Sequence, residues 1–132
     1  MEFMTYLLDT HTFLWAVQED WKLGSGARDA IENIKSKLFV SAVSAFEIAN
    51  KYRIGKLPDY RYVAENCLDL IRRLGADELQ ISAQHAYFAA KFEWEHRDPF
   101  DRILAAQAAA ENLILITNDS VFDSLSWVAT LW

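Results

Sequence analysis

The stretch DPFDRILAAQAAAENLILITND, residues 98–119, predicts a helix that is followed directly by a buried strand. Asp98 is a good N-terminal cap, Pro99 suits the first helical position, and the alanine-rich run behind them has high helix propensity. Asn112 can adopt the left-handed conformation that ends a helix. Residues 113–116 are the most hydrophobic short run in the chain and suit a strand buried on both faces.

The rest of the chain shows the same alternation. Short apolar runs bounded by polar residues predict further strands at residues 6–8, 38–41, 79–81 and 127–130. Helical spacing and turn residues predict further helices at about residues 12–17, 27–35, 43–53, 62–74 and 82–93, and Gly75 stands where glycine commonly ends a helix. We therefore expect one α/β domain over residues 1–132, with a short, mostly parallel central sheet and helices on both of its faces.

The composition predicts a globular protein that stays in the cytoplasm. The chain has 132 residues, 52% of them hydrophobic, and Cys67 is the single cysteine, so no internal disulfide can form. Its first residues lack a secretory signal, and no apolar run approaches the roughly 18 residues of a membrane span. The net charge of −6 is unusual for a nucleic-acid binder, but carboxylates that hold cations contribute negative charge that the bound ions cancel.

Five acidic residues stand where predicted strands end or predicted helices begin. They are Asp9, Glu47, Asp98, Asp101 and Asp119. Because ligand sites of parallel sheets lie beyond the carboxyl ends of the strands, acids at these positions gather at one edge. Bare carboxylates would repel one another there, and oxygen ligands of this kind suit Mg²⁺ or Mn²⁺. Such a site favours in-line displacement at phosphorus, so the pattern indicates metal-dependent phosphoryl chemistry.

Helix capping offers a second interpretation for three of these acids. Residues 44–47 match a capping box, in which the glutamate only bonds back to the serine amide. Asp98 is explained by its place as an N-cap, and Asp101 then lies in the first turn, where the helix dipole favours a carboxylate. Asp9 and Asp119 directly follow buried apolar strands, and capping explains them less well.

Four segments resemble, in order, the motifs of PIN-domain proteins, and they most resemble the VapC-type toxins of bacterial toxin–antitoxin pairs. The segments are LLDTHTFLW at residues 7–15, VSAVSAFEI at 40–48, HRDPFDRILAAQA at 96–108 and LITND at 115–119. Each motif alone is weakly specific, whereas the ordered set covers nearly the whole chain. The resemblance implies a PIN-like three-layer fold and a metal-dependent endoribonuclease. It also implies a toxin that is usually a homodimer and is neutralised by a cognate antitoxin.

The resemblance also implies roles for the acids. Asp9, Glu47 and Asp101 match the family's metal-site acids, and Asp119 matches the fourth acid of the catalytic set. Asp98 belongs to a variant of the third motif, and it either helps to hold the Mg²⁺ or Mn²⁺ ion or only caps the helix.

Contacts with the RNA substrate are expected from polar and basic residues beside the acids. The candidates are Thr10, Thr117, Lys51, Arg53, Arg97 and Arg102. Cations beside a phosphate-cutting site can position the RNA backbone, although a solvated helix face is the better explanation for at least half of them. His11 and His96 also lie beside motif acids, but imidazole suits Mg²⁺ poorly, so we do not expect them to be metal ligands.

Other functional classes fit the sequence less well. A phosphatase of the haloacid-dehalogenase type needs Asp-x-Asp, but the position two residues after Asp9 is His11. A dinucleotide-binding loop fails because Gly24 and Gly26 are not followed by a glycine at position 29. The alternatives that stay open are a catalytically weak or inactive PIN-type module that binds RNA or a partner, and a different metal-dependent phosphohydrolase.

Overall fold

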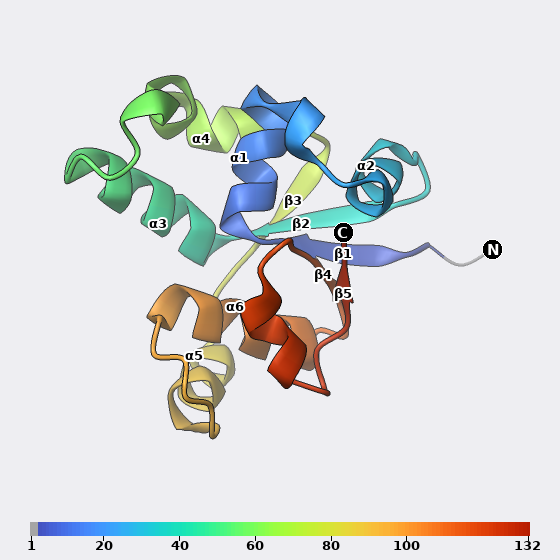
Figure 1. Cartoon of the computed structure of the whole chain (residues 1–132), viewed down its shortest axis with the longest axis vertical. Coiled ribbons are helices and arrows are strands. Elements are labelled where there is room, and N and C mark those ends of the chain that lie inside the picture. Colours follow the sequence, from blue (N-terminus) through green and yellow to red (C-terminus); the bar gives the residue numbers. More distant parts are fainter. Residues whose placement is uncertain (1–2) are drawn as a thin grey trace.

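A computed structural model describes residues 3–132, which form a five-stranded sheet between two layers of helices (Figure 1). The strands are β1 (Thr5–Leu8), β2 (Lys37–Ser41), β3 (Ala76–Leu79), β4 (Ile114–Ile116) and β5 (Thr130–Leu131). Their order is β3-β2-β1-β4-β5, and every neighbouring pair is parallel. The predicted α/β class and three-layer arrangement are confirmed, and the sheet is parallel throughout rather than mostly.

Helices cover both faces of this sheet. In the described part of the chain they are α1 (Thr10–Gln18), α2 (Ser25–Glu32), α3 (Ala42–Arg53), α4 (Arg61–Arg73), α5 (Ala83–Lys91) and α6 (Pro99–Ala110). Three short 3-10 turns are η1 (Asp20–Lys22), η2 (Pro58–Tyr60) and η3 (Ser120–Ser124). Figure 1 shows α1 to α4 above the sheet and α5 and α6 below it. No helix in residues 3–132 is long and apolar enough to cross a membrane.

Two apolar cores result, because successive side chains of a strand point to opposite faces of the sheet. In β1, Leu8 belongs to the core under α1 and α4, together with Phe13. Its neighbour Leu7 belongs to the other core, together with Leu104 of α6 and Phe122 of η3. All five side chains are fully buried, which explains why the strands are continuous apolar runs and not alternating ones.

The order of the strands puts a topological switch point at the carboxyl ends of β1 and β4. The chain runs from β1 to β2 and β3 over the face that carries α1 to α4. It returns through α5 and α6 on the other face to β4, on the opposite side of β1. The connections therefore leave β1 and β4 in opposite directions, and ligands of open α/β sheets bind at such a switch point.

Two strand predictions were wrong in their bounds. The strand predicted at 79–81 is β3 at Ala76–Leu79, where the charged side chains of Asp77 and Glu78 interrupt the apolar pattern. This edge strand pairs only with β2, so its side chains are less buried than those of the central strands. The strand predicted at 127–130 is β5 at Thr130–Leu131, because residues 126–128 form a turn first.

Helix ends were predicted more accurately. Gly75 and Asn112 have positive φ angles of 82° and 54°, as a left-handed helix end requires. The helix predicted at 27–35 is α2 at Ser25–Glu32, and Gly24 is its N-cap rather than part of a longer break. The predicted helical face included Ile34, which lies beyond the end of α2 and is exposed.

The segment between α5 and α6 is held by Arg102. Its Nε donates to the carbonyl of Ala89 at 2.8 Å, and its terminal nitrogens donate to the carbonyls of Phe92, Trp94 and His96. The Phe92 ring lies 4.4 Å from the guanidinium carbon. One side chain of α6 therefore fixes the backbone that enters the same helix.

We expect Arg102→Gln to lower the free energy of unfolding by about 3 kcal/mol, because four carbonyls lose a charged donor and only part of the loss is recovered from water. Arg97→Gln is the matched control, since Arg97 is exposed and five residues away on the same segment. Urea denaturation of both variants measures the difference. Equal losses in the two variants would contradict the anchoring role of Arg102.

Candidate active site

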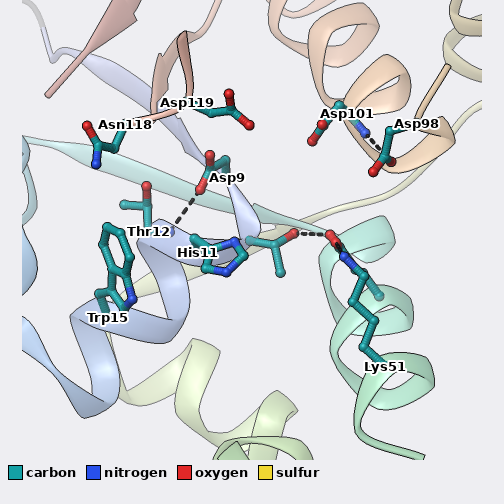
Figure 2. A pocket seen from close by; sticks show the side chains of 11 residues that line it. Asp9, His11, Thr12, Trp15, Lys51, Asp98, Asp101, Asn118 and Asp119 are labelled. Atoms are coloured by element: carbon teal, nitrogen blue, oxygen red, sulfur yellow. Dashed lines mark hydrogen bonds and ion pairs between the residues drawn. The ribbon is translucent and has the colours of Figure 1, made fainter. Parts of the chain in front are cut away.

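A cleft of about 390 Å³ opens at the carboxyl edge of the sheet. It contains all five acids singled out from the sequence, which come from four separate segments of the chain (Figure 2). The cleft is lined by Asp9, Thr10, His11, Thr12, Trp15, Glu47, Lys51, Asp98, Asp101, Asn118 and Asp119. The predicted convergence of the acids is thus present in the fold.

Asp9 is the buried acid at the end of β1, and it is also the N-cap of α1. Its Oδ1 accepts from the Thr12 amide at 2.8 Å, and its Oδ2 accepts from the Thr117 hydroxyl. The Thr12 hydroxyl donates to the Ile116 carbonyl at 2.7 Å, which ties α1 to β4. Burial raises the pKa of Asp9, and the hydrogen bonds from Thr117 and Thr12 oppose that shift only in part.

The capping-box interpretation of residues 44–47 is wrong. The N-cap of α3 is Ser41, whose hydroxyl accepts from the Val43 amide at 3.0 Å. Ser44 is therefore the third residue of α3 and is fully buried. A capping box would require Ser44 to be the N-cap itself. The helix starts earlier because Ser41 ends β2 and caps α3 without an intervening loop.

Glu47 is held in the cleft by side chains and not by its own helix end. The Thr10 hydroxyl donates to Glu47 Oε1 at 2.6 Å, and Lys51 pairs with the other oxygen. Ser44 Oγ lies 2.9 Å from Thr10 Oγ1. Since Thr10 has one hydroxyl proton and gives it to Glu47, Ser44 must be the donor in that contact. Ser44 was not predicted to be a site residue, because the sequence pattern indicated that it caps the helix.

Asp98 is both an N-cap and a member of the cleft. Its Oδ1 accepts from the amides of Phe100 at 2.8 Å and Asp101 at 3.3 Å, as predicted for a cap. Its second oxygen makes no hydrogen bond within residues 3–132, and the residue lines the cleft. The two interpretations left open for Asp98 therefore do not exclude each other.

Asp101 lies beside Asp98 on the first turn of α6. Its Oδ2 is 2.7 Å from His96 Nε2. Burial, and then the charges of Asp98 and Glu47, raise the pKa of Asp101 to about 6, while the contact with His96 opposes this shift. A carboxyl group with such a pKa is one that a bound cation would stabilise in its charged form.

Asp119 closes the cleft on the β4 side. It caps η3, with Oδ1 accepting from the Val121 amide at 3.0 Å, and its own amide donates to Thr117 Oγ1 at 3.0 Å. Its side chain is exposed, unlike that of Asp9. Asn118 also lines the cleft, although it was not singled out from the sequence. Its place between two predicted site residues after a buried strand is the signal that could have identified it.

The residues proposed to contact RNA differ in their positions. Lys51 lines the cleft, whereas Arg53 is exposed and donates to Asn50 on α3. Arg97 is exposed and lines an apolar recess between α5 and α6, and Arg102 is engaged by backbone carbonyls. Of these four cations, Lys51 is therefore the one whose position supports contact with a substrate in the cleft.

The two threonines hold carboxylates. Thr10 and Thr117 are each about 95% buried, and each donates its hydroxyl proton to an acid of the cleft, Glu47 and Asp9 respectively. Neither has a proton left to donate to a phosphate oxygen. Their geometry supports orientation of ligands, and it gives no support to direct contact with RNA.

The donor set of the cleft fits a hard divalent cation. Five carboxylates line the cleft together with Lys51 and the exposed His11, and His96 contacts Asp101 from beside it, so negative charge is in excess. Two of the acids, Asp9 and Asp101, are desolvated enough to raise their pKa. Carboxylate oxygens are the ligands that Mg²⁺ and Mn²⁺ prefer, and an ion would offset both the repulsion and the loss of hydration.

The fold and the cleft together define an α/β protein with a carboxylate site at the switch point of a parallel sheet. The profile of the PIN domain matches residues 6–128, so this chain belongs to the PIN-domain family. The ribonuclease VapC16 of Mycobacterium tuberculosis is 36% identical over 58 residues. That match covers 44% of this chain and 41% of the length of the relative.

Solved structures show the same fold at low sequence identity. VapBC2 from Rickettsia felis, bound to a promoter DNA fragment, has a chain with a TM-score of 0.70 at 18% identity, covering 96% of this chain and 97% of that one. DNA-bound VapBC from Salmonella typhimurium gives 0.68 at 16% identity, with 96% of each chain covered. FitAcB from Neisseria gonorrhoeae gives 0.63 at 19%, again with 96% of each chain covered. These similarities confirm the PIN-like fold.

The raised pKa of Asp101 predicts how metal-free stability depends on pH. Between about pH 4 and 6 the folded chain binds more protons at this residue than the unfolded chain, so its free energy of unfolding falls as the pH rises. Above about pH 6 the folded protein keeps the full free-energy cost of a charged, desolvated Asp101. Asp101→Asn should therefore stabilise the metal-free protein at pH 7.5 by about 1 to 2 kcal/mol, since one pKa unit corresponds to about 1.4 kcal/mol and solvent screens part of it.

A bound divalent ion should reverse the relative stabilities of the original chain and Asp101→Asn. Mn²⁺ should raise the melting temperature of the original chain at pH 7.5, less so at pH 5, where protons compete, and barely at all for Asp101→Asn. Urea denaturation and thermal melts in EDTA and in Mn²⁺, at both pH values, measure the effect. Asp77→Asn is the control, because Asp77 is an exposed acid on the edge strand β3, outside the cleft. A metal effect that survives in Asp101→Asn would contradict this assignment.

Proposed function

We propose that this chain is a metal-dependent endoribonuclease that acts in the cytoplasm as the toxin of a toxin–antitoxin pair. The observation that carries the proposal is the cleft, in which five acids from four segments meet at the switch point of the sheet. The similarity over 58 residues to a protein named a ribonuclease supports RNA as the substrate. A carboxylate site of this kind suits hydrolysis of a phosphodiester bond.

The metal would be held by Asp9, Glu47 and Asp101, with Asp119 and the free oxygen of Asp98 within the same cleft. When bound, Mg²⁺ or Mn²⁺ activates water and stabilises charge on the attacking and leaving oxygens. Asp9 and Glu47 enter this role with their carboxylates already oriented, because Thr117 and Thr10 donate to them. Preorientation matters since a misplaced group loses much of its contribution to the rate.

Lys51 is the residue that we assign to the RNA backbone. Its ammonium group pairs with Glu47 and lies 5.6 Å from the centre of the Phe100 ring, at the wall of the cleft. A cation there can meet a phosphate oxygen and partly offset the negative charge of the surrounding acids. The side chain is partly buried, so its position is restricted before the substrate arrives.

The proposal also includes two protein partners, an antitoxin and a second copy of this chain, which the relatives suggest. A toxin–antitoxin complex from Klebsiella pneumoniae contains a chain of this fold, with a TM-score of 0.59 at 19% identity and with 95% of this chain and 96% of that chain covered. We propose a cognate antitoxin protein as the inhibitor and a homodimer as the working state. Residues 3–132 include a dozen exposed large apolar side chains, among them Trp21, Ile34 and Phe46, which provide surface for both contacts.

Cleavage of RNA tests the enzymatic part. Purified chain with structured RNAs and Mg²⁺ or Mn²⁺ should release defined fragments on a denaturing gel, whereas Asp9→Asn should reduce the rate at least about a hundredfold, because a buried metal ligand is lost. Asp77→Asn, which leaves the cleft intact, should cleave as the original chain does. Absence of cleavage, or equal cleavage in Asp9→Asn and in EDTA, would refute the nuclease. Binding of RNA without cleavage would favour the inactive RNA-binding alternative.

Growth of cells tests the toxin part. Expression of the chain alone should arrest growth of a bacterial host, and co-expression of the small adjacent gene should restore it. Asp9→Asn should grow normally, because arrest depends on the same buried acid. Growth without arrest, at a protein level comparable to that of the variant, would refute the toxin role and leave the nuclease proposal intact.

A further inference from the structure

We propose that His96, Asp98 and Asp101 together bind a divalent transition-metal ion through one imidazole nitrogen and two carboxylate oxygens. This inference rests on the proposed function in that it takes the same cleft to be a metal site. It goes further, because it adds a nitrogen ligand to a set of acids and thereby predicts which ions the protein prefers.

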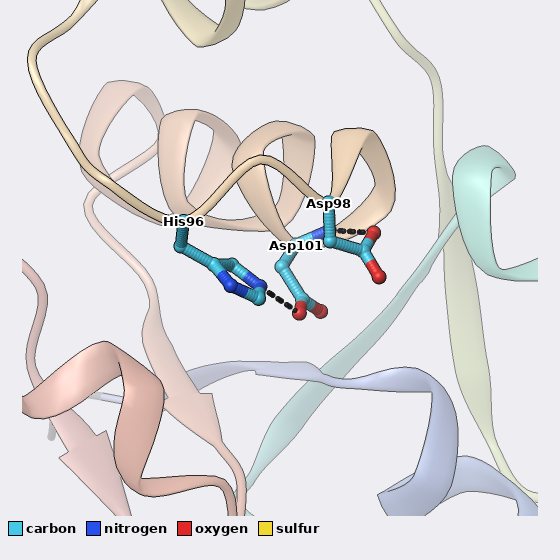
Figure 3. Close-up of side chains that lie close together, drawn as sticks. All are labelled: His96, Asp98 and Asp101. Carbon is cyan, nitrogen blue, oxygen red and sulfur yellow. Dashed lines mark hydrogen bonds and ion pairs between the residues drawn. The ribbon is translucent and has the colours of Figure 1, made fainter.

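The geometry of the three side chains is that of a nearly formed site. One ligand atom from each residue lies within 4.8 Å of the other two, and His96 Nε2 is 2.7 Å from Asp101 Oδ2 (Figure 3). Adjacent ligands of an ion with bonds of about 2.1 Å lie about 3.0 Å apart, and opposite ligands about 4.2 Å apart. Shifts of a few tenths of an ångström therefore bring the three atoms around one ion.

Neighbouring residues position Asp98 and His96 through atoms other than those that would bind the ion. Asp98 caps α6 with Oδ1, and its Oδ2 makes no hydrogen bond in the described part of the chain. The His96 carbonyl accepts from Arg102 at 2.9 Å, and the His96 ring packs 4.8 Å from the Trp94 ring. The backbone and the ring plane of the histidine are thus positioned by packing contacts.

The ligand types make the cleft asymmetric. His11 lines the cleft beside Asp9, but among the described residues only His96, at the α6 end, has a ring nitrogen within 4.8 Å of two carboxylates. Imidazole binds Co²⁺, Ni²⁺ and Zn²⁺ well, Mn²⁺ accepts mixed sets, and Mg²⁺ strongly prefers oxygen. Imidazole suits Mg²⁺ poorly, but it suits these other ions, so His96 is a candidate ligand for them.

The test detects the nitrogen ligand directly, in the full chain and without RNA. Metal-stripped protein at saturating Mn²⁺ should show electron spin-echo modulation from an imidazole ¹⁴N nucleus. His96→Phe should lose the modulation while keeping a ring against Trp94, and His11→Phe, at the exposed histidine of the same cleft, should keep it. His96→Phe should also lower the affinity for Co²⁺ by about tenfold or more, with the affinity for Mg²⁺ changing less than about threefold.

A second variant separates ligation from positioning. If His96 only orients Asp101 by a hydrogen bond, His96→Gln should restore the Co²⁺ affinity, and no ¹⁴N modulation should be present in any form of the protein. Either result would overturn the inference, as would equal Co²⁺ affinity in His96→Phe and the original chain. Thermal melts without metal confirm that each variant is folded.

The outcomes also distinguish this inference from the proposed function. Cleavage of RNA in Mg²⁺ with no nitrogen signal in Mn²⁺ would refute the histidine ligand and keep the nuclease. A histidine-dependent signal with no cleavage of any RNA would support the metal site and refute the nuclease.

Discussion

Repulsion between desolvated carboxylates at one edge of the sheet is the constraint on which the rest of this structure depends. Burial alone raises the pKa of Asp9, and neighbouring charges add to burial at Asp101. The fold counters this cost with hydroxyl donors that come from other parts of the chain. Thr117 of the segment after β4 donates to Asp9, and Thr10 of α1 donates to Glu47. These contacts orient the acids while leaving their charge for a cation to neutralise.

Three of the acids also begin helical segments, which shows that capping and metal binding are compatible uses of one carboxylate. Asp9, Asp98 and Asp119 each accept a backbone amide bond at the first turn that follows. A carboxylate has two oxygens and about four lone pairs, so one or two backbone bonds leave capacity for another ligand. Because the amides at a helix start carry partial positive charge, the cap also lowers the cost of placing the acid there. Helix capping and metal binding are therefore not alternatives for these three acids.

The α/β class, the parallel sheet and the five acids were predictable, because short apolar runs and the residues that end them are local signals. The predictions that failed concern residues whose roles depend on contacts between distant parts of the chain. The bounds of β3 were predicted wrongly because it contains the charged residues Asp77 and Glu78. An edge strand can carry them, since it does not need apolar residues on both faces. Ser44 looked like a cap and is instead buried against Thr10, 34 residues earlier in the chain. Arg102 looked like a cation for RNA, but its guanidinium binds four carbonyls that no spacing pattern reveals.

The two sides of the cleft are built by different forces, and this decides how each responds to change. Asp9 and Thr117 follow β1 and β4, so the backbone ladder of the central sheet fixes their separation. His96 and Asp98 belong to a connection outside the sheet, whose shape depends on Arg102 and on the aromatic rings of Phe92 and Trp94. A backbone ladder shared by neighbouring strands holds the first side, whereas the second side depends on side-chain contacts. Substitutions at Arg102 or at these rings therefore act on the histidine side of the cleft, and they leave the separation of Asp9 and Thr117 to the sheet.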